Sequence, residues 1–253
     1  MDLFEALRAD SGVVAVVGAG GKKTTLYTLA ERAASDAGRR AVVTATVRIP
    51  VFDRRVSEVV VTDDPVTTLE RAAEWPLGVV PAREGEDRYA GYEPAVIDDI
   101  AAADVADLVL VKADGARTRE FKAPGDHEPQ LPRTADTVVP IASVRAVGKP
   151  LSAEHVHRPE RVGAITGRER GETIRPEDVA RVLASERGGL KGVPDGATVV
   201  PLLNKVDDAG RRAVAEEIAT GLLERAPAVK RVVLARMVAD EPIVDVLEPS
   251  GSR

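Results

Sequence analysis

The sequence predicts an α/β protein built on a doubly wound, mainly parallel sheet with helices on both faces. Short apolar runs rich in β-branched residues recur along the chain, and segments with apolar residues at helical spacing separate them. This alternation favours a parallel sheet, because parallel strands need crossover helices between them. A glycine-rich turn between the first run and the first helical segment is a third indication, since such turns bind ligands in these folds.

The elements follow from these patterns in chain order. Strands are expected at residues 13–17, 41–46, 59–61, 108–113, 137–141, 198–203 and 231–235. Helices are expected at residues 23–37, 66–73, 95–102, 176–186 and 208–225. Pro176 suits the first turn of its helix, and Asp207 and Asp208 are both available to cap the last one.

One long irregular insertion interrupts the alternation at about residues 115–171. It is rich in Pro, His, Arg and Glu, and only one convincing strand falls within it. Such a long irregular segment is uncommon in a compact domain. We therefore expect either a functional loop region or a small additional unit packed on the sheet. No repeat, low-complexity tract or linker divides the chain, which predicts a single domain over residues 1–253.

Composition narrows the classes of function. An apolar share of 44% with 30% charged residues excludes a disordered chain, and the absence of Cys excludes disulfides and thiolate chemistry. With 35 Lys and Arg against 41 Asp and Glu, the net charge of -6 predicts no nucleic-acid partner. No basic leader and no long apolar run are present, so we expect a cytoplasmic protein without a membrane partner.

The glycine-rich turn has the order of a P-loop: strand, glycine loop, lysine, threonine, helix. Glycines let the backbone wrap a phosphate, helix N–H groups supply positive potential, and a lysine binds the terminal phosphates. The standard spacing G-x-x-x-x-G-K-S/T would need a glycine at Val16 or Val17, so this loop is shorter or carries an extra lysine. The alternative is a plain glycine turn with two solvated lysines. The predicted nucleotide-binding residues are Gly18, Ala19, Gly20, Gly21, Lys22, Lys23, Thr24 and Thr25.

A carboxylate follows the buried run at residues 108–111. Asp114 should lie at the sheet edge where ligands bind, and it is predicted to hold Mg²⁺ through water, together with the Thr24 hydroxyl. Lys22 and Asp114 are therefore the candidate catalytic residues. The alternative for Asp114 is a turn-forming Asp-Gly pair.

A third element follows the apolar run at residues 199–203. The N-K-x-D sequence formed by Asn204, Lys205 and Asp207 is the guanine-reading element of GTPases, in which the carboxylate accepts from N1–H and the 2-amino group. Asp207 is alternatively only a helix cap. The D-x-x-G of many GTPases is absent, because Arg117 stands where its glycine would be.

Taken in order, these motifs resemble the selenium-dependent hydroxylase accessory proteins, the YqeC-type family. The resemblance covers nearly the whole chain, and K-A-P, H-E-P and H-R-P-E at their separations are more specific than a P-loop match. The motifs are the glycine loop, V-T-A-T-V-R-I at 43–49, A-D-G-A-R at 113–117, K-A-P at 122–124, H-E-P at 127–129, G-K-P-L at 148–151, H-R-P-E at 157–160 and N-K-V-D at 204–207. Two residues depart from the family: Lys23 stands where Thr or Ser usually follows the first lysine, and Lys112 replaces an acidic residue.

The resemblance implies a P-loop-type fold and a role in maturing a selenium-dependent molybdenum hydroxylase or its cofactor. The glycine loop, Asp114 and the N-K-x-D element themselves predict Mg²⁺ and GTP, or ATP, as ligands. The resemblance adds an apo-molybdoenzyme or a molybdenum cofactor intermediate as the implied partner. The candidate substrate or partner residues are Arg48, Arg117, Lys122, His127, Glu128, His157 and Arg158. Charged loop residues of this kind are otherwise solvated, and His155 with His157 is too small a set for a metal.

Two other classes of function remain open. A P-loop with a nearby carboxylate also serves a small-molecule kinase or nucleotidyl-type transferase, in which the Arg, Lys and His loop binds an anionic acceptor. The third is a non-catalytic module in which the nucleotide only holds a conformation. In each case a chain without Cys cannot hold selenium as a selenosulfide.

Overall fold

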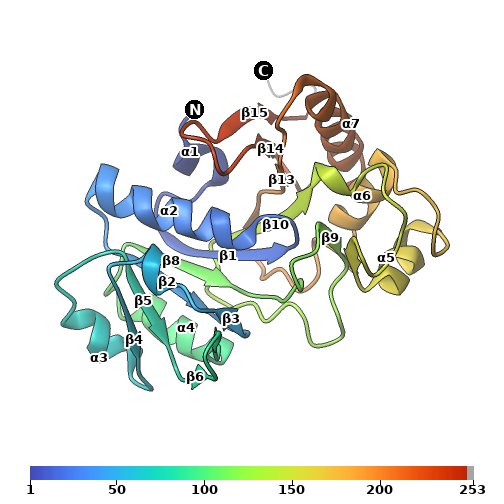
Figure 1. Ribbon diagram of the computed structural model, residues 1–253. Helices are drawn as coiled ribbons and strands as arrows, with labels where there is room; N and C mark the ends of the chain where they lie inside the picture. Colours follow the sequence, from blue (N-terminus) through green and yellow to red (C-terminus); the bar gives the residue numbers. More distant parts are fainter. Residues whose placement is uncertain (250–253) are drawn as a thin grey trace.

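The computed structural model describes residues 1–249 and contains a 10-stranded central sheet (Figure 1). Its order is β15-β14-β13-β10-β1-β8-β2-β5-β4, with β12 also paired to β10. Every pair is parallel except β14 with β15, so the predicted mainly parallel sheet is confirmed. The strands are β1 (Gly12–Gly18), β2 (Ala41–Ala45), β4 (Glu58–Val61), β5 (Leu77–Val80), β8 (Leu108–Lys112), β10 (Thr137–Ser143), β12 (Thr198–Val199), β13 (Leu202–Asn204), β14 (Val232–Ala235) and β15 (Ile243–Leu247).

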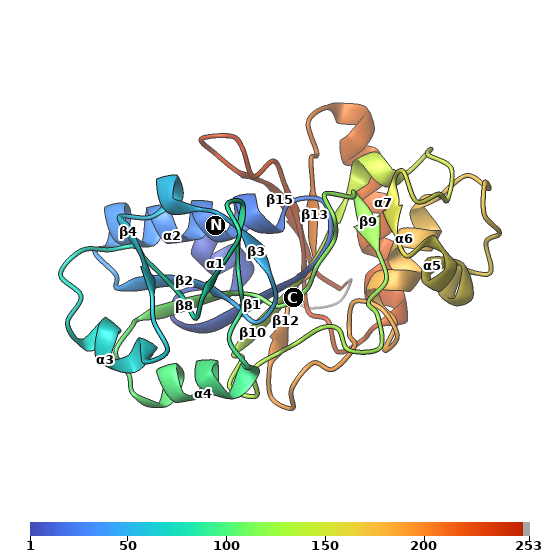
Figure 2. The same cartoon turned by 60° about the horizontal axis from the view of Figure 1, so that its bottom comes forward.

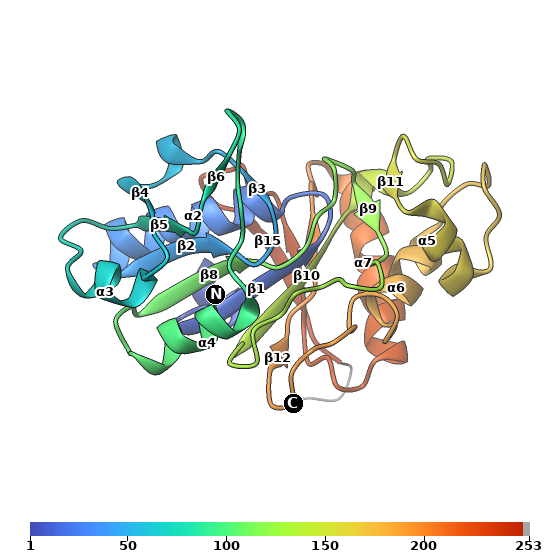
Figure 3. The same ribbon diagram turned by 90° about the horizontal axis from the view of Figure 1, so that it is seen from below.

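Helices cover both faces of this sheet, as a doubly wound fold requires. One face packs against α1 (Leu3–Leu7) and α2 (Lys22–Ala37). The other packs against α3 (Pro65–Glu70) and α4 (Pro94–Ala102) at one end, and against α6 (Pro176–Leu183) and α7 (Ala209–Arg225) at the other. Figures 2 and 3 show these two helix groups at opposite ends of the sheet.

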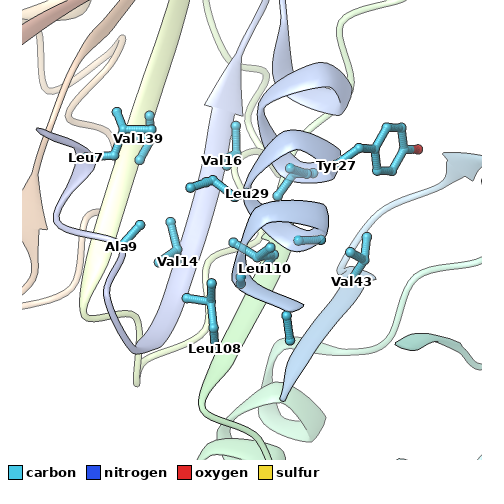
Figure 4. Close-up of a cluster of buried hydrophobic side chains, with 14 of the residues drawn as sticks. Leu7, Ala9, Val14, Val16, Tyr27, Leu29, Val43, Leu108, Leu110 and Val139 are labelled. Carbon is cyan, nitrogen blue, oxygen red and sulfur yellow. The ribbon is translucent and has the colours of Figure 1, made fainter. Parts of the chain in front are cut away.

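The alternation of side chains along β1 explains how one strand serves both layers. Val14 and Val16 point into the core beneath α2, where Figure 4 shows them beside Leu29. Val13 and Ala15 belong to the core on the α4 side, because successive strand residues face opposite ways. All four side chains are fully or almost fully buried, so β1 is the centre of the fold.

The position of β1 also determines where a ligand site can form. From β1 the chain runs outward to β2, β4 and β5, returns as β8 beside β1, and then continues on the other side through β10, β13 and β14. The strand order therefore reverses around β1. In open α/β sheets such a switch point opens a crevice at the carboxyl ends of the strands.

Several elements differ from the expectations. The run at residues 198–203 forms two short strands rather than one, because Pro201 between them has no N–H for the ladder. The helices expected at 66–73 and 176–186 end earlier, as α3 and α6. Strands β5 and β15 and helix α1 were not predicted.

The long insertion is more ordered than expected. It contains β9 (Phe121–Lys122), which pairs in parallel with β11 (Val156–His157), and the helix α5 (Pro159–Thr166). Figure 3 shows this unit beside α6, next to the end of β10. The remaining elements are η1 (Asp53–Arg55), η2 (Val144–Ala146) and a small sheet of β3 (Ile49–Pro50), β6 (Arg83–Glu84) and β7 (Arg88–Tyr89). Across residues 1–249, no helix combines the length and apolar character needed to cross a bilayer.

Candidate functional site

The glycine loop joins β1 to α2 at the switch point. Gly18 and Gly20 have φ angles of 89° and 87°, and a Cβ on either would collide with the end of β10, at Ile141 and Ser143. Glycine is therefore required at both positions. Helix α2 starts at Lys22 without a side-chain cap, so its first N–H groups are left for a ligand.

A buried ion pair lies beneath this loop. Lys22 and Asp114 are 6% and 2% exposed, and Lys22 Nζ lies 2.9 Å from Asp114 Oδ1. Asp114 Oδ2 accepts a hydrogen bond of 2.8 Å from the Gly18 N–H, and Lys22 donates to the Gly18 carbonyl. Asp114 Oδ1 contacts the ammonium but accepts no hydrogen bond of ordinary geometry. The predicted catalytic pair is thus in direct contact at the loop.

The ion pair continues into the insertion as a chain of alternating charges. Lys122 Nζ lies 2.9 Å from Asp114 Oδ2 and 2.8 Å from Glu128 Oε2, and the same Glu128 oxygen accepts from Arg158 at 2.6 Å. We call these five residues, Lys22, Asp114, Lys122, Glu128 and Arg158, the charge chain. It links five of the motifs named above, from the glycine loop to H-R-P-E.

The charge chain keeps both carboxylates ionised. Burial by itself would raise the pKa of Asp114, but Lys22 and Lys122 outweigh this effect and lower it. Burial opposes ionisation of Glu128 too, yet Lys122 and Arg158 lower its pKa to about 2. The charge chain thus has three basic side chains for two carboxylates, and burial lowers the pKa of Lys22 even though Asp114 contacts it.

The N-K-x-D element meets the glycine loop directly. Asn204 Nδ2 donates to the Gly20 carbonyl at 2.9 Å, and Asn204 Oδ1 accepts from the Met237 N–H at 3.2 Å. The Asn204 side chain is buried and therefore ties β13 to the loop and to the segment after β14. Lys205 pairs with Glu120 at 2.6 Å.

Asp207 does not cap the helix that follows it. The cap of α7 is Asp208, whose Oδ1 accepts from the Arg211 N–H at 2.9 Å. Asp207 Oδ2 instead accepts from Arg145 at 2.7 Å and from Arg211 at 2.9 Å. Within residues 1–249 Asp207 Oδ1 accepts no hydrogen bond, and Asp207 lines the pocket described next.

These elements surround one pocket of about 980 Å³, near the top of the range of about 300–1,000 Å³ for ligand sites. Ten of its lining residues are Lys or Arg and only three are Asp or Glu, although the protein has a net charge of -6. The cations are Lys22, Lys23, Arg48, Arg88, Lys112, Arg117, Arg119, Arg158, Lys205 and Arg236. The pocket therefore concentrates positive potential in an acidic protein.

Most predicted site residues gather at this pocket. The lining includes Gly20, Gly21, Lys22, Lys23, Thr24, Arg48, Arg117, Glu128, His157, Arg158, Asn204, Lys205 and Asp207. Five others lie at the loop or below the pocket without lining it: Gly18, Ala19, Thr25, Asp114 and Lys122. His127 is exposed and lies outside the lining. Within residues 1–249, no group of three His, Cys, Asp or Glu side chains is placed to hold a metal.

The two threonines that follow Lys23 have hydroxyls in different surroundings. Thr25 is completely buried, and its Oγ1 donates back to the Gly21 carbonyl at 3.2 Å. Thr24 lines the pocket, and its hydroxyl has no partner within the described chain. Thr24 is therefore the hydroxyl that is available to a ligand or metal.

Sequence reasoning missed several pocket residues. Lys112 was noted only as a departure from the family, yet it lines the pocket and donates to the Arg48 carbonyl at 2.7 Å. Burial, reinforced by Lys22, lowers the pKa of Lys112 to about 7. Arg236 also lines the pocket and directly follows β14. Its position after a predicted strand could have indicated it, because the carboxyl ends of the parallel strands meet at the site. Nothing in the sequence indicated Arg88, which lies on the separate strand β7.

Fold and site together define an α/β protein with a short glycine loop and a basic pocket at the switch point of its sheet. Residues 14–160 match the family model described as YqeC protein. The chain is also 30% identical over 195 residues to a protein of Escherichia coli (strain K12) named "Uncharacterized protein YqeC", which covers 76% of this chain and 75% of that relative. The chain belongs to the YqeC family, as its motifs predicted. The family match contains the glycine loop and the charge chain and ends before Asn204.

Proposed function

We propose that this protein binds a Mg²⁺-nucleoside triphosphate in the basic pocket, with GTP preferred over ATP. The hydrogen bond from Asn204 to the Gly20 carbonyl is the observation that supports this most, because it joins a phosphate-binding loop to a base-reading element. Strand order places β13 on one side of the loop and β8 on the other. A nucleotide would then extend from the base at β13 to the terminal phosphate near Asp114.

The phosphate end is supported by charge and by open backbone donors. Lys22 lies at the entrance of α2, whose first N–H groups have no side-chain cap. A triphosphate would give Lys22 a second anionic partner beside Asp114, and charge-assisted contacts of this kind are among the stronger hydrogen bonds. The excess of ten Lys and Arg over three acids in the lining adds a favourable potential for any polyanion.

A magnesium ion would take most of its ligands from phosphate oxygens and water, as Mg²⁺ generally does. The protein offers the unpartnered Thr24 hydroxyl as a direct ligand, while Asp114, which is buried against Lys22 and does not line the pocket, would act through water. When bound, the ion would neutralise phosphate charge and orient the terminal phosphate.

The base end is supported by the free oxygen of Asp207. Arg145 and Arg211 both donate to Asp207 Oδ2, so Asp207 Oδ1 can accept a hydrogen bond from a base. Guanine presents N1–H and a 2-amino group side by side, and one carboxylate can accept from both. Adenine has no such pair of donors. The Met237 N–H is held by Asn204 at the same end of the pocket.

Binding measurements test this proposal directly. GTP, GDP and ATP are titrated with and without Mg²⁺ into wild type, Lys22→Ala and Lys149→Ala, the last being an exposed lysine outside the pocket. We expect Lys22→Ala to weaken GTP binding about tenfold or more, with a smaller effect on GDP, and Lys149→Ala to change neither. Absence of nucleotide binding by wild type, or equal losses in the two variants, would refute the site.

The biological role that we propose follows from the family resemblance: an accessory step in maturing a selenium-dependent molybdenum hydroxylase or its cofactor. A strain that lacks the protein is supplied with wild type, Lys22→Ala or Lys149→Ala, and hydroxylase activity in extracts is measured. Rescue by wild type and Lys149→Ala but not by Lys22→Ala supports a nucleotide-dependent role. Full hydroxylase activity without the protein would refute it.

A further inference from the structure

A second group of pocket residues comes from the segment after β8 and from the insertion, whose β9–β11 pair lies next to the end of β10. Arg117 follows β8, while His157 and Arg158 come from β11 and the start of α5. Pairing of β9 with β11 places His157 in register with Lys122 of the charge chain. Two segments about 40 residues apart in the sequence therefore present cations to one end of the pocket.

The backbone at this end is held in an uncommon conformation. Arg117, Thr118 and Arg158 have φ angles of 48°, 61° and 63°, in the left-handed region. Of the six non-glycine residues with positive φ among residues 1–249, these three and Lys205 line the pocket. Such conformations persist where the surrounding structure fixes them, and they concentrate at binding sites.

Charge at this end is not balanced within the protein. Glu128 is already shared by Lys122 and Arg158, at 2.8 Å and 2.6 Å. The Arg117 guanidinium is exposed and has no partner within the described chain. The Arg117 guanidinium is thus available to an external anion, and Arg158 has only a share of one carboxylate. Arginine forks match phosphate geometry well.

His157 adds an uncharged group to this cluster. Burial, together with Arg158 and Lys122, lowers its pKa to about 4, so the imidazole is neutral at pH 7. Neither ring nitrogen has a hydrogen-bond partner within residues 1–249, and the residue lines the pocket. A neutral imidazole can donate one hydrogen bond to a ligand and accept another.

We propose that Arg117, His157 and Arg158 form a second subsite that binds the phosphomonoester group of a small second substrate. The subsite is connected to the glycine loop through the charge chain, so the inference rests on the proposed nucleotide site for its arrangement. It requires two anionic molecules in one pocket, which the volume of about 980 Å³ and the ten lining Lys and Arg residues accommodate.

The test is calorimetric titration of inorganic phosphate, and then phenyl phosphate, into protein saturated with GDP and Mg²⁺ at constant ionic strength. The variants are Arg117→Ala, Arg158→Gln and, as a matched control, Arg170→Ala, an exposed arginine outside the pocket. We expect both probes to bind the GDP-saturated wild type. Arg117→Ala and Arg158→Gln should raise the phosphate Kd about tenfold or more, and by a larger factor than they raise the GDP Kd, whereas Arg170→Ala should change neither.

Titration of nucleotide-free protein separates this inference from the proposed function. If GDP does not bind, the subsite still stands when phosphate binding depends on Arg117 and survives Lys22→Ala. Phosphate binding that is lost in Lys22→Ala and unchanged in Arg117→Ala would place the anion at the glycine loop and overturn the subsite. No phosphate binding to the GDP-saturated protein, or binding of free phosphate with exclusion of phenyl phosphate, would overturn it as well.

Discussion

Lys122→Met is the substitution that most directly tests the charge chain. Lys122 is buried and contacts two carboxylates, Asp114 at 2.9 Å and Glu128 at 2.8 Å. Methionine keeps a similar shape and removes the charge, so the variant leaves the buried Asp114 and the partly buried Glu128 with fewer cations. Removal of one partner from a buried ion pair typically destabilises a protein by about 3–5 kcal/mol.

The pKa of Glu128 gives an independent magnitude. Its decrease from 4.5 to about 2 corresponds to about 3 kcal/mol of preferential stabilisation of the charged form. Because the folded-state pKa is the lower one, this stabilisation is fully present above about pH 4.5 and is lost as the pH falls toward 2. Lys122 and Arg158 share it, so Lys122→Met should remove part of this pH dependence as well.

Urea unfolding at pH 7 and pH 3 measures both effects. At pH 7 we expect Lys122→Met to lose about 3–5 kcal/mol, which lowers the Tm by roughly 6–20 °C in a chain of this size. Glu128→Gln and the double variant complete a cycle with an expected coupling of about 1–3 kcal/mol. Lys149→Met, at an exposed lysine, should be neutral. If Lys122→Met lowers the free energy of unfolding by less than about 1 kcal/mol, or if the two single effects are additive, Lys122 and Glu128 are not coupled as the charge chain requires.

Three further variants test the remaining contacts. Asn204→Ala leaves the Gly20 carbonyl without its hydrogen-bond donor. Urea unfolding should show a free energy of unfolding lower by about 2–4 kcal/mol, and GTP titration should show a weaker affinity. If neither value changes, Asn204 does not link the glycine loop to the base-reading element. Asp207→Asn should lower the affinity for GTP and raise it for xanthosine triphosphate, by roughly tenfold or more; no exchange of preference refutes guanine reading. Thr24→Val should reduce the magnesium dependence of GTP binding and Thr25→Val should mainly reduce stability; the opposite result assigns the metal to Thr25.

Much of the fold was predictable because burial on both faces of a parallel strand leaves a local signature. The apolar runs that became β1, β2, β8, β10 and β14 are such strands. The signature failed where burial is partial or the run is short. Every residue of β15 is only partly buried, and Gly78 interrupts the four residues of β5. The ordered unit of β9, β11 and α5 was missed because two-residue strands have no periodicity to detect.

The sequence alone determined the glycine loop, the N-K-x-D element and the Asp at the end of a buried strand, because each is a local pattern with a local physical cause. Only the tertiary structure decided that Lys22, Asp114, Lys122, Glu128 and Arg158 form one chain of charges. Their contacts depend on the insertion of β8 beside β1 and on the pairing of β9 with β11. Strand order is settled by the packing of the whole core, and no window of sequence contains that information.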